Sequence, residues 1–138
     1  PLTYKKPVIN GVAEYLPFKD NIFQTVLLVT TICFVDDSKK TIFEANRILK
    51  KNGQLIIAFV DKDSELGKIY QKNKEKSKFY NEAVFYSTVE ILELLRNQNF
   101  QNIDIIQTVF GNYKEIKTVQ KFKYNFGEGN FVVIKAEK

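Results

Sequence analysis

The sequence contains no histidine and only one cysteine, Cys33. Without histidine the chain lacks the commonest general base and the commonest metal ligand, and the usual hydrolytic triads of serine or cysteine are disfavoured. A single cysteine excludes an intramolecular disulfide, and its place inside an apolar run predicts a buried, small hydrophobic residue. We therefore expect no metal site and a reducing, cytoplasmic setting.

Phosphate-binding glycine loops are also missing, because neither G-x-G-x-x-G nor G-x-x-x-x-G-K occurs. Arginine is limited to Arg47 and Arg96, and the net charge of +5 comes from lysines scattered among acids. Scattered lysine is typical of a solvated surface rather than of a nucleic-acid-binding face. The longest apolar run is too short to cross a membrane, and nothing resembles a signal peptide. We expect neither nucleic acid nor a membrane as a partner.

The longest apolar stretch runs from Phe23 to Asp36 without polar alternation. Such a run is typical of a strand covered on both faces, in the middle of a parallel sheet. Thr30 and Thr31 lie within it, and ligands of parallel sheets bind at the carboxyl ends of the strands. The sequence therefore predicts a site at the pair of threonines.

A helix and a second strand follow this run. The helix is predicted over Ser38–Lys51, with Asp36 or Asp37 as its cap, and the strand over Gln54–Val60. Strand, helix and strand with short links form a parallel crossover unit, so we expect one α/β domain over residues 1–138. The other predicted elements are a short strand over 8–13, a helix capped by Ser64, a helix over 87–97 opened by the capping box Ser87–Glu90, and strands over 103–110 and 131–136.

Residues 62–86 are charged and rich in lysine, and the second half of this segment gathers aromatic side chains. We interpret the segment as a helix and loop that can cover a substrate as a lid. Two interpretations of the aromatic residues stay open, namely core packing and the wall of a substrate pocket. The candidate pocket residues are Tyr70, Phe79, Tyr80, Phe85 and Tyr86.

Paired carboxylates occur at Asp36–Asp37 and at Asp61–Asp63. Both pairs stand where helix caps belong, and capping is favoured over catalysis because Asp is a preferred capping residue. The sequence therefore assigns no catalytic residue.

Residues 8–60 carry a recognisable series of motifs. These are Gly11-Val12-Ala13-Glu14-Tyr15-Leu16-Pro17-Phe18 with Asp20 and Phe23, then Glu44-Ala45-Asn46-Arg47-Ile48-Leu49-Lys50, then Asn52-Gly53-Gln54-Leu55. The series resembles class I S-adenosylmethionine-dependent methyltransferases, in the type 11 branch that is similar to enzymes of ubiquinone and menaquinone biosynthesis. From 84 to 136 the resemblance is one of topology only.

The resemblance implies a Rossmann-like sheet with the family strand order 3-2-1-4-5-7-6, of which this chain matches the carboxyl-terminal part, from the third strand onward. The expected remainder is a mixed sheet in the order 4-5-7-6 with flanking helices. The implied activity is methyl transfer from S-adenosyl-L-methionine to a small molecule. The implied cofactor neighbours are Val12, Ala13 and Glu14 at the adenine, and Val29, Thr30 and Thr31 at the methyl donor. For the two threonines, β-branched strand filler is the other interpretation.

The family's glycine-rich loop after the first strand, and the acid after the second, have no counterpart here. We therefore expect a fragment that does not bind the cofactor alone. The alternative is a non-catalytic binding or assembly module that keeps the α/β scaffold. In either case the strand at Phe23–Val29 becomes an edge, and we expect it to pair with another copy or with the missing piece.

Overall fold

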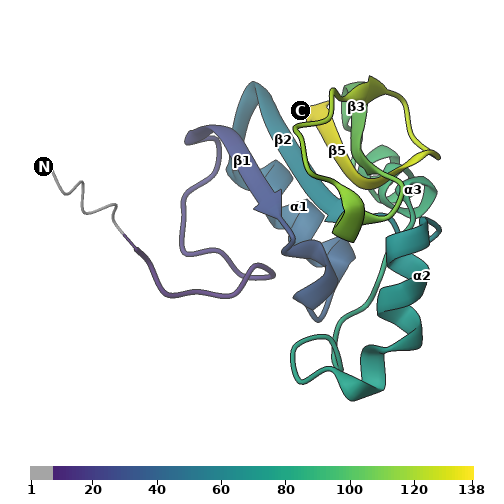
Figure 1. Cartoon of the computed structure of the whole chain (residues 1–138). Coiled ribbons are helices and arrows are strands. Elements are labelled where there is room, and N and C mark those ends of the chain that lie inside the picture. The colour runs from purple at the N-terminus through teal and green to yellow at the C-terminus, as the bar shows by residue number, and fades with distance from the viewer. Residues whose placement is uncertain (1–7) are drawn as a thin grey trace, which may run out of the picture.

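The computed structural model describes residues 8–138, which form one five-stranded mixed sheet in the order β1-β2-β5-β3-β4 (Figure 1). β1 and β2 are parallel, and the other neighbours are antiparallel. The strands are β1 Phe23–Val29, β2 Leu49–Val60, β3 Gln101–Phe110, β4 Lys123–Tyr124 and β5 Gly129–Glu137. The first four strands of this order confirm the predicted truncated sheet, and β4 adds a short strand at the far edge.

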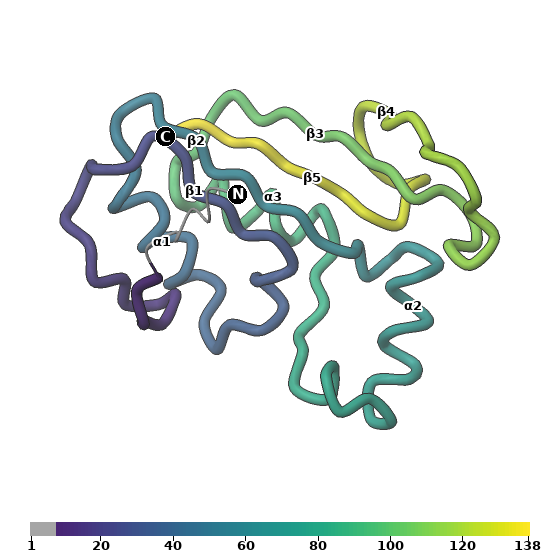
Figure 2. The backbone as a smooth tube through the Cα atoms, turned by 60° about the vertical axis from the view of Figure 1, so that its left-hand side comes forward, coloured from purple at the N-terminus to yellow at the C-terminus, as the bar shows by residue number. Residues whose placement is uncertain are grey.

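Three α-helices lie on the same side of the sheet (Figure 2). They are α1 Ser38–Ile48, α2 Glu65–Lys72 and α3 Thr88–Asn97. Short 3-10 turns occur at η1 Ile32–Phe34, η2 Lys74–Lys76 and η3 Tyr113–Glu115. α1 connects the parallel strands β1 and β2, as the sequence predicted. α2 and the chain after it extend away from the sheet, beyond the ends of β1 and β2 (Figure 1).

The core lies between the sheet and the helices. Ile57 of β2 pairs with Ile134 of β5, and both side chains are fully buried on the helix side. On the opposite face of β1, Leu27 is 60% and Val29 is 53% exposed. The prediction that this strand is covered on both faces is therefore wrong for the described chain, because all three helices cover one face. The prediction that it forms an edge is confirmed by the strand order.

Two strand predictions need correction. Where a strand was expected over 8–13, residues 8–11 have no regular structure and Val12 to Tyr15 form a turn, in which Tyr15 N donates to Val12 O at 3.1 Å. Within residues 8–138 this stretch pairs with no strand of the sheet, so its β-branched residues have no ladder to join. β1 ends at Val29 because Thr30 takes a left-handed φ of 52° and redirects the chain into η1. Cys33 lies in that turn and is half-buried rather than buried.

The helix starts follow the sequence closely. Asp37 accepts from Lys40 N at 2.9 Å, Ser64 accepts from Gly67 N at 3.0 Å, and Ser87 forms the predicted capping box with Glu90. α1 ends three residues before the predicted Lys51, since Leu49 is already extended and begins β2.

Candidate functional site

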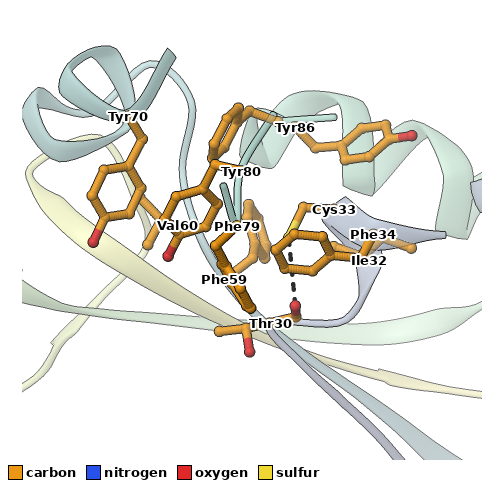
Figure 3. Close-up of a pocket in the computed structure, with 11 residues that line it drawn as sticks. Thr30, Ile32, Cys33, Phe34, Phe59, Val60, Tyr70, Phe79, Tyr80 and Tyr86 are labelled. Carbon is orange, nitrogen blue, oxygen red and sulfur yellow. Dashed lines mark hydrogen bonds between the residues drawn. The ribbon is translucent and has the colours of Figure 1, made fainter. Parts of the chain in front are cut away.

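The carboxyl ends of β1 and β2 border a cavity of about 100 Å³ with a mostly aromatic wall (Figure 3). Its lining residues are Thr30, Ile32, Cys33, Phe34, Phe59, Val60, Tyr70, Phe79, Tyr80, Phe85 and Tyr86. All five aromatic residues that the sequence proposed for a pocket are among them. The lining side chains include no aspartate, glutamate, lysine or arginine.

Tyr80 lies at the centre of the aromatic wall. Its ring stacks on Tyr70 of α2 with centroids 4.9 Å apart, and on Phe34 of η1 at 6.0 Å. Phe79 meets both Phe34 and Tyr80 edge to face, at 4.9 and 5.0 Å. Aromatic pairs at these distances contribute about 0.5–1.5 kcal/mol each beyond their buried area. The ring contacts therefore hold α2, η1 and the chain at Phe79 and Tyr80 together around the cavity.

Two polar side chains of the cavity, Tyr70 and Cys33, are weak acids that stay protonated at neutral pH. Burial, and then the neighbouring Tyr80, raises the pKa of the Tyr70 hydroxyl. Burial also raises the pKa of the Cys33 thiol, whose Sγ donates to the carbonyl oxygen of Thr30 at 3.4 Å (the dashed line in Figure 3). The wall offers ring faces and hydroxyl dipoles, but no base.

Asp61, the residue after β2, organises the starts of the next two helices. It is 5% exposed. Its Oδ1 accepts from Asp63 N at 2.8 Å, and its Oδ2 accepts from Thr88 N at 3.0 Å and from Thr88 Oγ1 at 2.5 Å. A carboxylate with three donors is committed to holding the chain, which is the capping role that the sequence favoured for it.

α2 is held against the sheet by Asn130 and by a close backbone approach. Asn130 Oδ1 accepts from Leu66 N at 2.8 Å, and its Nδ2 donates to Val109 O at 2.6 Å. A Cβ atom added to Gly67 would lie 2.1 Å from Asp61 O, so only glycine fits there without movement. Sequence reasoning missed both residues, because their partners are distant in the chain or belong to the backbone.

The chain after α2 is also tied at two backbone positions. Val84 N donates to Cys33 O at 2.8 Å, and Lys62 N donates to Tyr86 O at 3.0 Å. Residues 62–86 therefore cover the cavity from one side. Their movement as a lid stays a prediction.

The loop over 8–22 is held on α1 by an ion pair from the motif Glu44-x-x-Arg47. Arg47 Nε donates to Glu44 Oε1 at 2.7 Å and Nη2 to Oε2 at 2.8 Å. Arg47 Nη1 donates to Phe18 O and to Asp20 Oδ1, both at 2.7 Å, and Leu16 N donates to Glu44 Oε2 at 2.8 Å. The hydrogen bond from Arg47 is the largest influence on the pKa of Glu44 and lowers it. Burial raises this pKa and the hydrogen bond from Leu16 N lowers it, and the pKa lies below its usual value.

Glu14 makes a second attachment of this loop. Its Oε1 accepts from Asp37 N at 3.2 Å and from Asp36 N at 2.8 Å, at the start of α1. The hydrogen bond from Asp37 N is the main cause that lowers the pKa of the Glu14 carboxyl. The carboxylate therefore positions the turn from Val12 to Tyr15, which the resemblance placed beside the adenine.

The six predicted cofactor neighbours do not converge on the aromatic cavity. Thr30 lines it, whereas Ala13 lines a separate groove along β1 with Phe18 and Phe23. Val12 and Val29 are more than half exposed, and Thr31 Oγ1 donates to Val29 O at 3.1 Å. The cofactor role of these six residues stays a prediction.

Residues 8–138 lack two features that would indicate other functions. They contain no group of three or more Cys, Asp or Glu residues arranged to hold a metal ion. None of their helices has the length and apolar character needed to span a membrane.

Comparison with known proteins agrees with the fold. The family described as "Methyltransferase domain" matches residues 2–57. An uncharacterized protein of Methanocaldococcus jannaschii is 47% identical over 133 residues, which cover 95% of this chain and 63% of that protein. A solved structure from Thermotoga maritima, described as a SAM-dependent methyltransferase and possible histamine N-methyltransferase, is 48% identical with a TM-score of 0.91. That match covers 94% of this chain and 63% of the Thermotoga chain.

The fold extends to distant proteins as well. A SAM-dependent methyltransferase from Archaeoglobus fulgidus has a TM-score of 0.70 at 12% identity, over 99% of this chain and 70% of that one. The chain spans about 63% of the two more similar relatives. Its strand order, its motifs and these matches agree, and the chain has the fold of class I S-adenosylmethionine-dependent methyltransferases.

Proposed function

We propose that this chain supplies the acceptor side of an S-adenosylmethionine-dependent methyltransferase that acts on a small molecule. The observation that carries the proposal is the aromatic cavity at the carboxyl ends of β1 and β2, where open α/β sheets bind their ligands. The match to the methyltransferase family model and the likeness to the Thermotoga structure support the cofactor, and the cavity supports an acceptor of small size. The Thermotoga relative is described as a possible histamine N-methyltransferase, and histamine is a small amine. This description also supports a small-molecule acceptor.

The residues present fit the positively charged sulfur of the cofactor. Thr30 O, Phe34 and Tyr80 offer a carbonyl dipole and ring faces, which favour a cation, and no lysine or arginine lines the cavity. When bound, S-adenosylmethionine supplies a methyl group on a positively charged sulfur. Transfer from such a donor relies mainly on alignment, so a site without a general base is compatible with it. Within this reading, the turn from Val12 to Glu14 faces the adenine and Val29 to Thr31 the donor.

The open edge of β1 is the place where we expect a partner to bind. No described strand pairs with the outer edge of Phe23–Val29, and the apolar groove lined by Ala13, Phe18 and Leu28 runs beside it. Leu27 and Val29 are exposed on the face that the helices leave uncovered. An open apolar edge pairs readily with another strand. We propose that β1 pairs with a polypeptide that carries the family's first strands, or with a second copy of this chain.

The pairing is tested by sizing with light scattering at several concentrations, for the wild type and for Leu27→Glu. We expect a dimer, or a complex with the added polypeptide, that Leu27→Glu weakens. The exposed Phe43→Glu on α1 is the matched control, because it changes an apolar side chain away from this edge. A wild-type protein that stays strictly monomeric, both alone and after mixing with a polypeptide that carries the family's first strands, would contradict the pairing proposal.

The activity is tested by calorimetric titration with S-adenosylhomocysteine. The chain is titrated alone, and again after mixing with the part of the Thermotoga maritima relative that it does not match. Heat of binding in the mixture, reduced by Tyr80→Leu, supports a shared methyltransferase site. Absence of heat in a complex that has demonstrably formed supports the second candidate instead, a non-catalytic assembly module, which the uncovered face and open edge of β1 favour.

The cellular setting belongs to the same proposal. Cys33 is a free cysteine. A free, half-buried thiol fits a reducing compartment, and we place the protein in the cytoplasm on that ground.

A further inference from the structure

We infer that the aromatic cavity receives a neutral amine nitrogen as the methyl acceptor and holds the methylated, cationic product against its ring faces. The inference rests on the proposed methyl transfer and adds the chemical class of the substrate. It depends on two features of the described residues: which groups line the cavity, and how the rings are arranged.

The lining groups discriminate among acceptor atoms. A phenol, an alcohol, a thiol or an activated carbon must lose a proton to become a good nucleophile, and this requires a nearby base. The lining contains none: the hydroxyl of Tyr70 and the thiol of Cys33 are both protonated at neutral pH. An unprotonated amine needs no base, because its lone pair is already available.

The acids close to the cavity have other partners. The carboxylate of Asp61 accepts one hydrogen bond from Asp63 N, before α2, and two from Thr88 at the start of α3. Glu90 accepts from Lys62 Nζ at 2.5 Å and from Ser87 N at 2.7 Å. Neither carboxylate is among the residues that line the cavity. These carboxylates are therefore not placed to deprotonate an acceptor, and they are not placed to form an ion pair with an ammonium group in the cavity.

The ring arrangement favours a cation over an anion. Tyr70 and Tyr80 stack, Phe34 lies on the other side of Tyr80, and Phe79 closes the group edge to face (Figure 3). The face of an aromatic ring is negative, so it attracts an ammonium group and repels a carboxylate or thiolate. Carboxylate acceptors, which need no base, are therefore disfavoured by charge.

The chemistry of transfer to nitrogen agrees with this wall. The acceptor nitrogen uses its lone pair to form a bond to the methyl carbon, the bond from that carbon to sulfur breaks, and the electron pair remains on sulfur as a neutral thioether. The positive charge thus moves from sulfur to nitrogen. A nitrogen that carried hydrogen then releases a proton to water. Ring faces stabilise the cation on either atom.

The size of the cavity limits the part of the substrate that it encloses. Its volume of about 100 Å³ is smaller than the roughly 150 Å³ of an engineered cavity that holds benzene. A dimethylamino or trimethylammonium head group suits this space better than a fused ring system. Phe79 is 67% exposed, so the remainder of the substrate extends toward solvent past its ring.

The test compares choline with its neutral isostere 3,3-dimethylbutan-1-ol, each titrated into the full chain. The chain contains 7 tyrosines and no tryptophan, so intrinsic fluorescence reports tyrosine alone. We expect choline to bind at least about tenfold more tightly than the isostere, because a desolvated cation–π contact contributes ~2 kcal/mol, more than the 1.4 kcal/mol of one tenfold step. Equal affinities, or no binding of choline, would overturn the inference.

Variants locate the effect. Tyr80→Phe keeps a ring and should retain the preference for choline, whereas Tyr80→Leu should reduce it to less than about threefold, since the central ring face is lost. Tyr124→Leu, on the exposed strand β4, is the matched control and should leave it unchanged. A preference that survives Tyr80→Leu in a folded variant, judged by far-ultraviolet circular dichroism, would place the cation elsewhere and contradict the inference.

The substrate class and the proposed function fail separately. If S-adenosylhomocysteine binds the completed protein but choline shows no preference, the methyltransferase proposal stands and the amine class is wrong. If choline is preferred but S-adenosylhomocysteine never binds, the cavity is a cation site of a non-catalytic protein, and the methyl-transfer part of the inference falls.

Discussion

Two segments, residues 8–22 and residues 62–86, pack beside the unit of β1, α1 and β2, and they are attached by different chemistry. The loop over 8–22 is held to α1 by charged groups, mainly Arg47, Glu44 and Glu14. The segment over 62–86 is held by buried polar side chains, by backbone hydrogen bonds and by stacked aromatic rings.

The difference predicts how each segment responds to solution conditions. Hydrogen bonds between charged, partly exposed groups weaken when salt screens them or when acid protonates a carboxylate. Buried bonds between polar groups respond little to either, but breaking one leaves a donor without a partner, which costs more. We therefore expect the 8–22 loop to loosen as the pH falls through the lowered pKa values of Glu44 and Glu14, while the aromatic wall stays in place. The following substitutions test this contrast, from the largest expected effect to the smallest.

Asp61→Ala should produce the largest loss of stability. The substitution leaves Thr88 N, Thr88 Oγ1 and Asp63 N without their acceptor at a nearly buried position. We expect the free energy of unfolding to fall by about 3 kcal/mol, since each buried donor without a partner costs about 1–3 kcal/mol. Urea unfolding followed by circular dichroism measures it.

The neighbouring Asp63→Ala is the control for this prediction. Asp63 is exposed, and its substitution should change stability by less than about 0.5 kcal/mol. Equal losses for the two variants would show that the carboxylate of Asp61 does not organise the starts of α2 and α3.

Gly67→Ala should displace α2 and open the aromatic wall. The new Cβ would meet Asp61 O and Lys62 Cα, both backbone atoms, at 2.1 and 2.7 Å. Overpacking of this kind costs about 2 kcal/mol, although alanine favours helices. Because Tyr70 stands on the same helix, choline binding should weaken too. Lys68→Ala, one exposed position further, is the control and should leave both unfolding and binding unchanged; a Gly67→Ala protein as stable as wild type would contradict the close approach.

Features that depend on neighbouring residues were predicted from the sequence, whereas contacts between distant residues were not. The spacing and caps of α1, α2 and α3 were predicted, because a cap depends on residues within one helical turn. The five aromatic residues were proposed for a pocket because they cluster within 17 residues of the chain. Their gathering around a cavity with Thr30 depends on the end of β1 and on Asn130, which is 64 residues from its partner Leu66. Nothing in the local pattern of either residue predicts that contact.

The family motifs illustrate the same limit. Glu44-x-x-Arg47 was identified by resemblance, whereas the structure shows that the pair carries the 8–22 loop. The left-handed turn at Thr30 also escaped prediction, since a β-branched residue rarely takes positive φ. The apolar run around it predicted a longer strand for that reason.

Glu44→Gln should weaken the attachment of the 8–22 loop in a pH-dependent manner. The folded pKa of Glu44 lies below its usual value of 4.5, so the ionised carboxylate stabilises the fold above that pH. This contribution is lost as the pH falls through the lowered pKa. We expect a loss of about 1–2 kcal/mol at pH 7 that disappears in more acidic solution, measured by urea unfolding across pH 2–7.

Glu93→Gln on the exposed side of α3 is the control for Glu44→Gln and should show almost no effect at any pH. Raising the salt concentration should shrink the Glu44→Gln effect but leave the Asp61→Ala effect intact. A Glu44→Gln loss that is independent of both pH and salt would erase the contrast between the two segments.

Thr30→Gly should have the smallest effect on stability, and in the opposite direction. A β-branched residue at a φ of 52° stores roughly 1–3 kcal/mol of strain, and glycine removes it but loses about 0.5–1 kcal/mol through the greater freedom of the unfolded chain. We expect a gain of about 0.5 kcal/mol, whereas Thr25→Gly in the extended part of β1 should lose about 1 kcal/mol. If choline binding falls in Thr30→Gly while stability rises, the strained turn serves the cavity rather than the fold. If stability falls as in Thr25→Gly, Thr30 contributes to the sheet like any other strand residue.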